Sequence, residues 1–378
     1  MHTRETADIV VVGGGVIGLS VARALALRGV EKVTLIERSQ LGAEASYAAA
    51  GMLAPQAEAD SADDFFNLAR ESRDLYPAFA AALYDETGVD IELDQTGTLY
   101  LALTDQDEEE IQKRFQWQRN AGLLVEMMTN HEARELEPAI NENVRAALRF
   151  PLDIQVENRR LLKALVAANQ ALGVRFIIGE TVEAVRICRG ASEGVESSGG
   201  FVSCKAIVIA GGAWSSTIGG LPSLEIEPVR GQMVCFSALE RVCRHVIYSP
   251  RGYIVPRTDG RLLAGSTSEH AGFERLVTAG GLLKILSRTL EISPQIAKLA
   301  VTDTWAGLRP RALDNLPVLG PDAEIDGLFY ATGHYRNGIL LAPITGELIA
   351  DAVMRNFDSS RFGAFSPGRF TSATITGF

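Results

Sequence analysis

The feature that most constrains this chain lies near its start, where a buried strand leads through a glycine-rich turn into a helix. Ile9–Val12 is a run of four β-branched residues, typical of a fully buried strand. Gly13, Gly15 and Gly18 then form a G-x-G-x-x-G pattern, and the apolar run from Val16 to Arg28 predicts a helix. Such glycines permit a tight turn, close approach of the backbone to a pyrophosphate and close packing of helix on strand. The free N–H groups of the helix would then face the phosphates.

The residues after this helix strengthen the prediction of a dinucleotide site. A second predicted strand, Val33–Ile36, ends at Glu37, nineteen residues after Gly18. A carboxylate at this position can accept hydrogen bonds from a ribose 2′-hydroxyl. An acid rather than an arginine here disfavours a 2′-phosphate, and therefore NADP. The pattern thus predicts a Rossmann-type α/β domain that binds a dinucleotide such as FAD or NAD.

Bulk properties narrow the class of protein further. A chain of 378 residues is long enough for two domains, and its net charge of −11 disfavours nucleic acid or an anionic membrane as a partner. The four cysteines contain no C-x-x-C pair, which favours a reduced, cytoplasmic protein, and no set of histidines and cysteines predicts a metal site. Residues 9–27 are apolar enough to suggest a signal peptide, but the fingerprint glycines and Arg23 favour strand, turn and helix. We therefore expect no targeting segment.

The rest of the chain alternates between predicted helices and strands. Helical spacing is present at residues 61–87, 105–118, 160–172, 282–290 and 339–354. Strands are predicted at residues 99–103, 174–178, 205–210, 233–236, 253–256, 262–265 and 327–332. Residues 190–200 are rich in Gly, Ser and Glu and predict an exposed hairpin tip, and the polar tail from Ser366 is expected to fray. A return strand at 205–210, far from the first fingerprint, is typical of a doubly wound domain with an insertion.

Five segments together carry a resemblance to a known family. They are the glycine turn with Glu37, then residues 46–53, 210–214, 305–310 and 334–343, in this order along the chain. With these segments the chain resembles the D-amino-acid-oxidase-like flavoproteins, and most closely their glycine oxidase branch, which serves thiamine biosynthesis. The match extends from about residue 8 to about residue 356.

The resemblance implies a fold of two interleaved domains. A Rossmann-type FAD-binding domain would be assembled from residues 1–85, 148–225 and 305–378. A second, antiparallel-sheet α+β substrate domain would consist of residues 86–147 and 226–304 and would cover the flavin. FAD would be bound non-covalently, because no cysteine that could tether it follows Cys243. The family also implies a homo-oligomer, specifically a homotetramer.

The resemblance assigns roles to individual residues. Arg309 would clamp the substrate carboxylate through its planar guanidinium, with the hydroxyl of Tyr253 assisting and with Arg336 and Met52 at the same pocket. The helix beginning near Ile339 would direct its N-terminus at the flavin N1–C2=O edge. The residues expected to bind FAD are Gly13, Gly15, Val16, Ile17, Gly18, Glu37, Arg38, Ser46, Ala49, Ala50, Gly51, Met52, Val182, Ala210, Gly211, Trp214, Gly307, His334, Arg336, Asn337, Gly338, Ile339 and Leu340.

The implied activity is FAD-dependent oxidation of glycine and other small primary or secondary amines. Hydride transfer to flavin would give an imine that hydrolyses to an oxo acid and ammonia, and molecular oxygen would be reduced to hydrogen peroxide. This chemistry needs a neutral amine in the correct orientation, so we assign no general-base role to His334 or His270. The open alternatives are a sarcosine or D-amino-acid oxidase, an amine dehydrogenase with another acceptor, a nicotinamide dehydrogenase, and a non-catalytic subunit.

Overall fold

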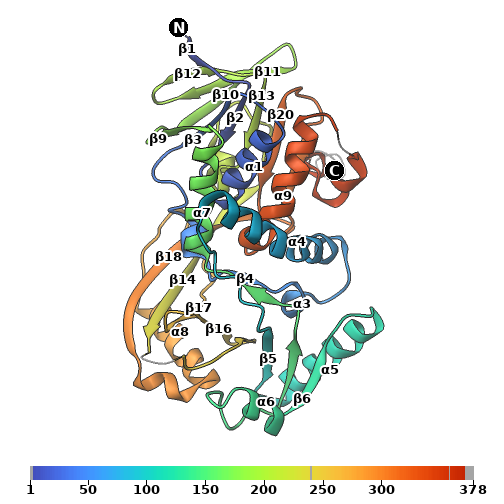
Figure 1. Ribbon diagram of the computed structural model, residues 1–378, viewed down its shortest axis with the longest axis vertical. Helices are drawn as coiled ribbons and strands as arrows, with labels where there is room; N and C mark the ends of the chain where they lie inside the picture. The colour runs from blue at the N-terminus through green and yellow to red at the C-terminus, as the bar shows by residue number, and fades with distance from the viewer. Residues whose placement is uncertain (1–2, 239–240, 357, 371–378) are drawn as a thin grey trace, which may run out of the picture.

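The first strand of the fingerprint lies inside a sheet that is parallel except at one edge (Figure 1). The computed structural model describes residues 3–238, 241–356 and 358–370. Within them this six-stranded sheet has the order β19-β20-β13-β2-β3-β9, and only β19 pairs antiparallel. The strands are β2 (Ile9–Val12), β3 (Val33–Glu37), β9 (Arg175–Ile178), β13 (Ala206–Ile209), β19 (Val318–Pro321) and β20 (Leu328–Thr332). The mainly parallel Rossmann-type sheet predicted from the sequence is confirmed, but the sheet is not doubly wound, because a second sheet rather than helices covers its other face.

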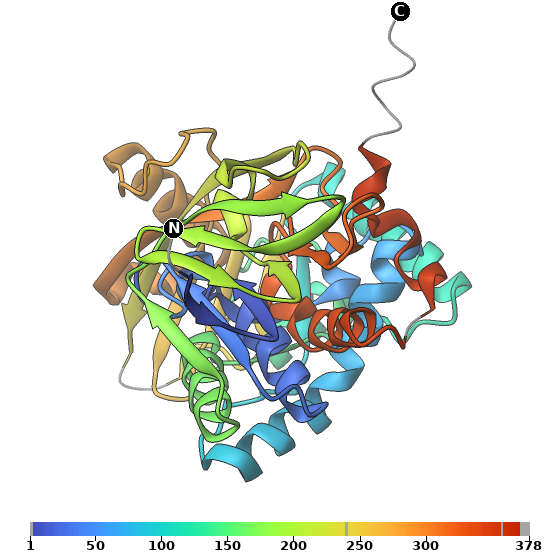
Figure 2. The same cartoon turned by 90° about the horizontal axis from the view of Figure 1, so that it is seen from above.

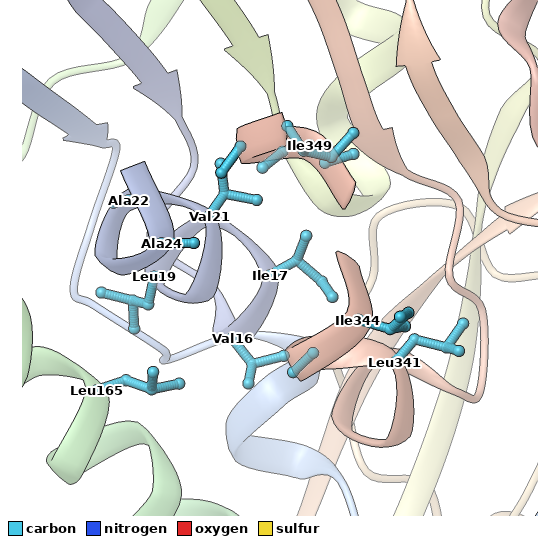
Figure 3. Packing of buried hydrophobic residues seen from close by; sticks show 14 of the residues in the cluster. Val16, Ile17, Leu19, Val21, Ala22, Ala24, Leu165, Leu341, Ile344 and Ile349 are labelled. Atoms are coloured by element: carbon cyan, nitrogen blue, oxygen red, sulfur yellow. The ribbon is translucent and has the colours of Figure 1, made fainter. Parts of the chain in front are cut away.

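Helices form a layer on one face of this sheet. They are α1 (Val16–Leu27), α4 (Asp64–Thr87), α7 (Asn158–Ala171) and α9 (Gly338–Val353). Figure 3 shows Ile17 and Val21 of α1 beside Ile344 and Ile349 of α9. The two helices approach so closely that a Cβ on Gly346 would lie 2.9 Å from the carbonyl oxygen of Ser20. This packing holds the N-termini of α1 and α9 in a defined relation.

A second sheet covers the other face, as the view from above shows (Figure 2). It has the order β1-β12-β11-β10, with β1 (Thr3–Thr6), β10 (Val182–Cys188), β11 (Ala191–Ser197) and β12 (Gly200–Ser203). The predicted exposed hairpin tip at 190–200 is therefore wrong, because most of it is the strand β11. Val195 is fully buried against the six-stranded sheet, and the turns lie on either side of β11.

The third sheet forms the lower part of the molecule in Figure 1 and is mainly antiparallel. Its order is β18-β14-β17-β16-β15-β5-β7-β6, and only the β15–β5 pair is parallel. The strands are β5 (Thr98–Ala102), β6 (Glu126–Thr129), β7 (Ala146–Phe150), β14 (Ile226–Ser237), β15 (Val246–Ser249), β16 (Gly252–Pro256), β17 (Arg261–Gly265) and β18 (Ala300–Ala312). Strand β18 continues through the expected domain boundary between residues 304 and 305. The predicted α/β fold with an additional antiparallel sheet is confirmed.

The remaining helices and the two-stranded sheet connect the larger sheets or cover them. They are α2 (Ala45–Ala48), β4 (Met52–Leu53), α3 (Pro55–Glu58), α5 (Asp105–Asn120), α6 (Asn130–Leu136), β8 (Ile154–Gln155) and α8 (Ala279–Ile292). Within the described ranges, every helix is too short or too polar to cross a membrane.

The tail differs in part from the expectation that it frays. A short 3-10 helix spans Pro367–Arg369, and the Arg369 guanidinium donates to the Asp314 carboxylate at 2.7 Å. The first residues of the tail are therefore ordered by this pair. Residues 371–378 lie outside the described residues.

Candidate active site

Two adjoining cavities open at the carboxyl ends of the parallel strands. We call the first the strand-end cavity, which is lined among others by Gly13, Glu37, Arg38, Val182 and Trp214. We call the second the inter-sheet cavity, because Thr332 of the six-stranded sheet and Tyr253 and Arg309 of the eight-stranded sheet line it, together with Met52 and His334. Five residues line both cavities, namely Gly15, Ala45, Ser46, Ala210 and Gly212. The two cavities therefore form one elongated groove, at the position where open α/β sheets bind ligands.

Sterics explain why glycine is needed in the first turn. Gly13 has a φ of +107°, and a Cβ there would lie 2.3 Å from the carbonyl oxygen of Ala210. A Cβ on Gly18 would lie 1.9 Å from the carbonyl oxygen of Gly13. Gly18 therefore supports the turn from behind rather than lining a cavity. At the N-terminus of α1, the Val16 N–H donates to the Ser46 hydroxyl at 3.0 Å.

Glu37 is held at the wall of the strand-end cavity. One carboxylate oxygen accepts from the Gly14 N–H at 2.7 Å and the other from the Ser39 N–H at 2.9 Å. The Ser39 hydroxyl also donates to this second oxygen at 3.2 Å, so the oxygen that accepts from Gly14 keeps a free lone pair and can still accept a hydroxyl. A backbone cradle that side chains would fill, a fixed carboxylate and an elongated groove together fit a dinucleotide.

The small-residue segment between α2 and β4 lines the inter-sheet cavity, and contacts on its other side hold it in place. Gly51 has a φ of +75°, and a Cβ there would lie 2.0 Å from the carbonyl oxygen of Val156. The Arg257 guanidinium donates to the carbonyl oxygens of Ala50 at 2.7 Å and Val156 at 3.0 Å. Burial lowers the pKa of Arg257 to about 10, so the guanidinium remains charged at neutral pH. Arg257 is not among the residues expected from the sequence, because an arginine after a strand gives no sign that it will be buried.

Arg309 points from β18 into the inter-sheet cavity with neutral hydrogen-bond partners. Its guanidinium donates to the Ser266 hydroxyl at 2.7 Å and to the Thr267 carbonyl oxygen at 3.1 Å. The space for it exists because β14 carries Gly231 at the diagonal position, where a Cβ would lie 2.2 Å from the guanidinium. A guanidinium fixed by neutral groups can still bind a carboxylate through two parallel hydrogen bonds.

Tyr253 lines the side of the inter-sheet cavity formed by the eight-stranded sheet, and a row of stacked tyrosines lies behind it. Tyr253 is buried on β16, and its hydroxyl donates to the Met233 sulfur at 3.2 Å. Tyr253 stacks on Tyr248 with ring centroids 6.2 Å apart, and Tyr248 stacks on Tyr100 at 5.5 Å. This row fixes the orientation of the Tyr253 ring.

Arg336 lies at the more exposed edge of the same cavity. Its guanidinium donates to the Tyr248 hydroxyl at 3.1 Å and lies 3.5 Å from the Glu58 carboxylate. The charge of Glu58, and after it Tyr248, holds the pKa of Arg336 above its usual range. Burial raises the pKa of Tyr248, so its hydroxyl keeps its proton. Arg336 is thus partly neutralised, whereas Arg309 is held by neutral groups.

The segment before α9 completes the inter-sheet cavity. His334 is buried, its Nε2 lies 3.0 Å from the Thr345 hydroxyl, and burial lowers its pKa to about 3. The imidazole is therefore neutral and directed at Thr345 of α9. His270 is exposed and lies 3.7 Å from Glu227. The N-terminal residues of α9, Gly338 and Ile339, line the cavity.

Most of the residues singled out from the sequence line this groove. The two exceptions are Gly18, which lies under the glycine turn, and Leu340, whose side chain is buried in the core and whose carbonyl oxygen accepts from the Ser72 hydroxyl. Residues that the sequence analysis missed are Glu58, Gly231, Met233, Tyr248 and Ser266. Only Gly231 carried a signal, since a glycine inside a strand indicates close approach of another group. Among the described residues, no group of three or more His, Cys, Asp or Glu could hold a metal ion.

Comparison with known proteins gives consistent matches over nearly the whole chain. The family model described as FAD dependent oxidoreductase matches residues 8–352. A glycine oxidase from Geobacillus kaustophilus is 38% identical over 366 residues, which cover 95% of this chain and 96% of that protein. The crystal structure of a glycine oxidase from the same species superposes with a TM-score of 0.92 at 37% identity, covering 96% of this chain and 98% of that one. The bifunctional protein ThiO/ThiG of Trichormus variabilis is 36% identical over 98% of this chain but only 56% of its own length.

Proposed function

This chain belongs to the family of FAD-dependent oxidoreductases, and from that premise we propose that it oxidises glycine and other small primary or secondary amines. The observation that carries the proposal is Arg309, a guanidinium with neutral partners inside a cavity continuous with the dinucleotide groove. Similarity to proteins named glycine oxidase, at 38% identity over 95% of the chain, supports glycine as the substrate.

We infer that the groove holds FAD along its length. The glycine turn and the N-terminus of α1 would receive the pyrophosphate, and Glu37 would accept a ribose hydroxyl. The inter-sheet cavity would receive the ring system, with the N-terminus of α9 and the segment Ala49–Met52 at its walls. When bound, FAD supplies the hydride acceptor and the route for electrons to molecular oxygen.

The residues of the inter-sheet cavity would bind and orient the substrate. Arg309 would hold the carboxylate, while Tyr253 and Met233 would form the wall against the substrate Cα. Hydride transfer requires the amine to be neutral and the Cα to be oriented correctly, so the site needs no protein base at this step. His334 is neutral and hydrogen-bonded to Thr345, which agrees with this requirement.

The product and the pathway follow from the same proposal. Loss of two electrons from glycine leaves an imine, whose hydrolysis gives glyoxylate and ammonia while oxygen becomes hydrogen peroxide. Similarity to a bifunctional protein whose name joins ThiO with ThiG supports a role in thiamine biosynthesis, where the imine itself would be used. We further propose a cytoplasmic enzyme, because the four cysteines contain no C-x-x-C pair and favour a reduced protein.

The first experiment is anaerobic mixing of the purified holoprotein with glycine, followed by admission of air. We expect the absorbance of oxidised flavin at about 450 nm to be bleached and then restored, with one peroxide formed per glycine consumed. Bleaching by sarcosine or a D-amino acid but not by glycine would refute glycine as the substrate. Bleaching that air does not reverse would refute oxygen as the acceptor.

A variant tests the role of Arg309 separately. Arg309→Ala should keep the flavin spectrum and lose roughly 2–5 kcal/mol of transition-state stabilisation, as when one partner of a buried charge pair is removed. The matched control is Arg355→Ala, which removes an exposed arginine that pairs with Asp326. An unchanged kcat/KM for glycine in Arg309→Ala would contradict the proposed clamp.

A further inference from the structure

A loop of the eight-stranded sheet contacts the outer wall of the strand-end cavity. We call residues 269–278, between β17 and α8, the latch loop. The Phe273 ring stacks on the Trp214 ring with centroids 5.5 Å apart and planes at 30°. The Arg275 guanidinium donates to the Glu44 carboxylate at 2.7 Å. Trp214 and Glu44 both line the strand-end cavity, so the tip of the loop holds two of its wall residues from outside.

The two wall residues are also linked to each other. The Arg38 guanidinium lies 3.4 Å from the centroid of the Trp214 ring and donates to the second Glu44 oxygen at 2.7 Å. These contacts therefore run in series from Phe273 through Trp214, Arg38 and Glu44 to Arg275, and the backbone of the latch loop joins the two ends. Three of these residues line the cavity, and the other two belong to the latch loop.

The ends of the latch loop are fixed, whereas its tip is exposed. The Gln232 side chain, on β14, donates to Glu269 at 2.8 Å and accepts from the Thr278 N–H at 2.9 Å. The Arg230 guanidinium adds a second bond to Glu269 at 3.0 Å. Phe273 is 45% exposed, and the Arg275 side chain is 50% exposed. A loop with fixed ends and an exposed tip can lift at the tip alone.

The contacts between the tip and the cavity wall are few, and the Arg230 guanidinium, 3.7 Å from the Glu274 carboxylate, is a further contact of the tip with its own sheet. One stacked ring pair and one partly exposed ion pair raise the equilibrium constant for the attached over the detached tip by a combined factor of roughly 3 to 70. The tip would therefore detach much more often than the sheet or the helices behind it unfold.

We propose that the latch loop retains the cofactor, because the nucleotide half of FAD leaves the strand-end cavity only when Phe273 and Arg275 detach from Trp214 and Glu44. The cavity carries the glycine turn and Glu37, the groups that fit the nucleotide half. Closing the tip fixes Trp214 and Glu44 against that half, and opening it frees both. The proposal requires that the protein binds FAD but does not depend on glycine being the substrate.

The test is the rate of FAD release from the holoprotein. The holoprotein would be mixed with an excess of a flavin-binding apoprotein that captures released FAD. The rate would be read from the change in flavin fluorescence as FAD passes from one protein to the other. We expect Phe273→Ala and Arg275→Gln each to raise the release rate constant about 2- to 10-fold, and the double variant to release faster than either. The control is Leu276→Ala, which removes a side chain of the same loop that is 65% exposed.

Two further measurements separate retention from general loosening. Phe273→Trp keeps a stacking ring and should keep slow release, while Phe273→Ala should not. The effect of Arg275→Gln should shrink as salt is raised, because the pair is partly exposed, whereas the effect of Phe273→Ala should remain. Release from the double variant within twofold of wild type, or equal acceleration by Leu276→Ala, would overturn the latch.

Discussion

Replacing Gly231 by alanine should disable the carboxylate clamp without touching Arg309 itself. The added Cβ would lie 2.2 Å from one guanidinium nitrogen and 2.4 Å from the guanidinium carbon, whereas ordinary contact begins near 3.4 Å. The backbone of β14 is held by pairing with β18 and β17, so the flexible guanidinium must retreat by about 1 Å.

The retreat should have a large effect on catalysis and a small one on folding. The Arg309 guanidinium cannot keep its hydrogen bonds of 2.7 Å to Ser266 and 3.1 Å to Thr267 after such a shift. A misplacement of about 1 Å costs on the order of 100-fold in rate, or about 2.7 kcal/mol of transition-state stabilisation. The free energy of unfolding should change by less than about 1 kcal/mol, because alanine is otherwise tolerated better than glycine in a strand.

The assay is kcat/KM for glycine, measured by peroxide formation in a double-mutant cycle with Arg309→Ala. If Gly231→Ala acts through Arg309, it should cost little in the Arg309→Ala background, so the two losses should not add. The control is Gly280→Ala, since a Cβ on Gly280 meets no atom within 4 Å. If Gly231→Ala lowered kcat/KM by the same factor with and without Arg309, the claim that it acts through Arg309 would be refuted.

Three other substitutions test separate parts of the argument. Gly18→Ala places a Cβ 1.9 Å from the Gly13 carbonyl oxygen, so the purified protein should lose its FAD on gel filtration. A variant that keeps its yellow flavin would contradict the proposed role of this turn in binding FAD. Arg257→Met leaves buried carbonyl oxygens without donors and should lower the free energy of unfolding in urea by at least about 2 kcal/mol. Burial lowers the folded-state pKa of His334 from 6.5 to about 3, so the unfolded chain is protonated first and stability falls as the pH drops below 6.5. His334→Gln should therefore lose about 2 kcal/mol less stability than wild type between pH 7 and pH 5 in urea titrations, and parallel curves would argue against a neutral His334.

Local patterns were enough to predict the first layer of the fold. The β-branched run at Ile9–Val12 and the spacing of the fingerprint glycines depend on neighbours within about 30 residues, and β2, α1 and β3 formed where these patterns indicated. The strand β11 was missed because its sequence is polar. Its Val195 is buried only because a second sheet covers the parallel one, and no pattern within residues 190–200 carries that information.

The resemblance to a family named the residues of the groove, but it could not describe their environment. Arg309 and Tyr253 were singled out from their motifs. Their partners, Ser266 for Arg309 and Met233 for Tyr253, lie on strands or loops that only the pairing of the eight-stranded sheet brings near.

The sequence by itself determined the dinucleotide turn, the acid that follows it and the helix before which His334 lies. Those features arise from backbone sterics and short-range periodicity, which neighbouring residues specify. The tertiary structure alone decided that Gly231 leaves room for Arg309, that Arg257 is buried beneath the loop along the groove, and that Phe273 reaches Trp214. Each of these contacts joins residues 59 to 207 positions apart, and no local pattern names the partner, because long-range packing brings the two segments together.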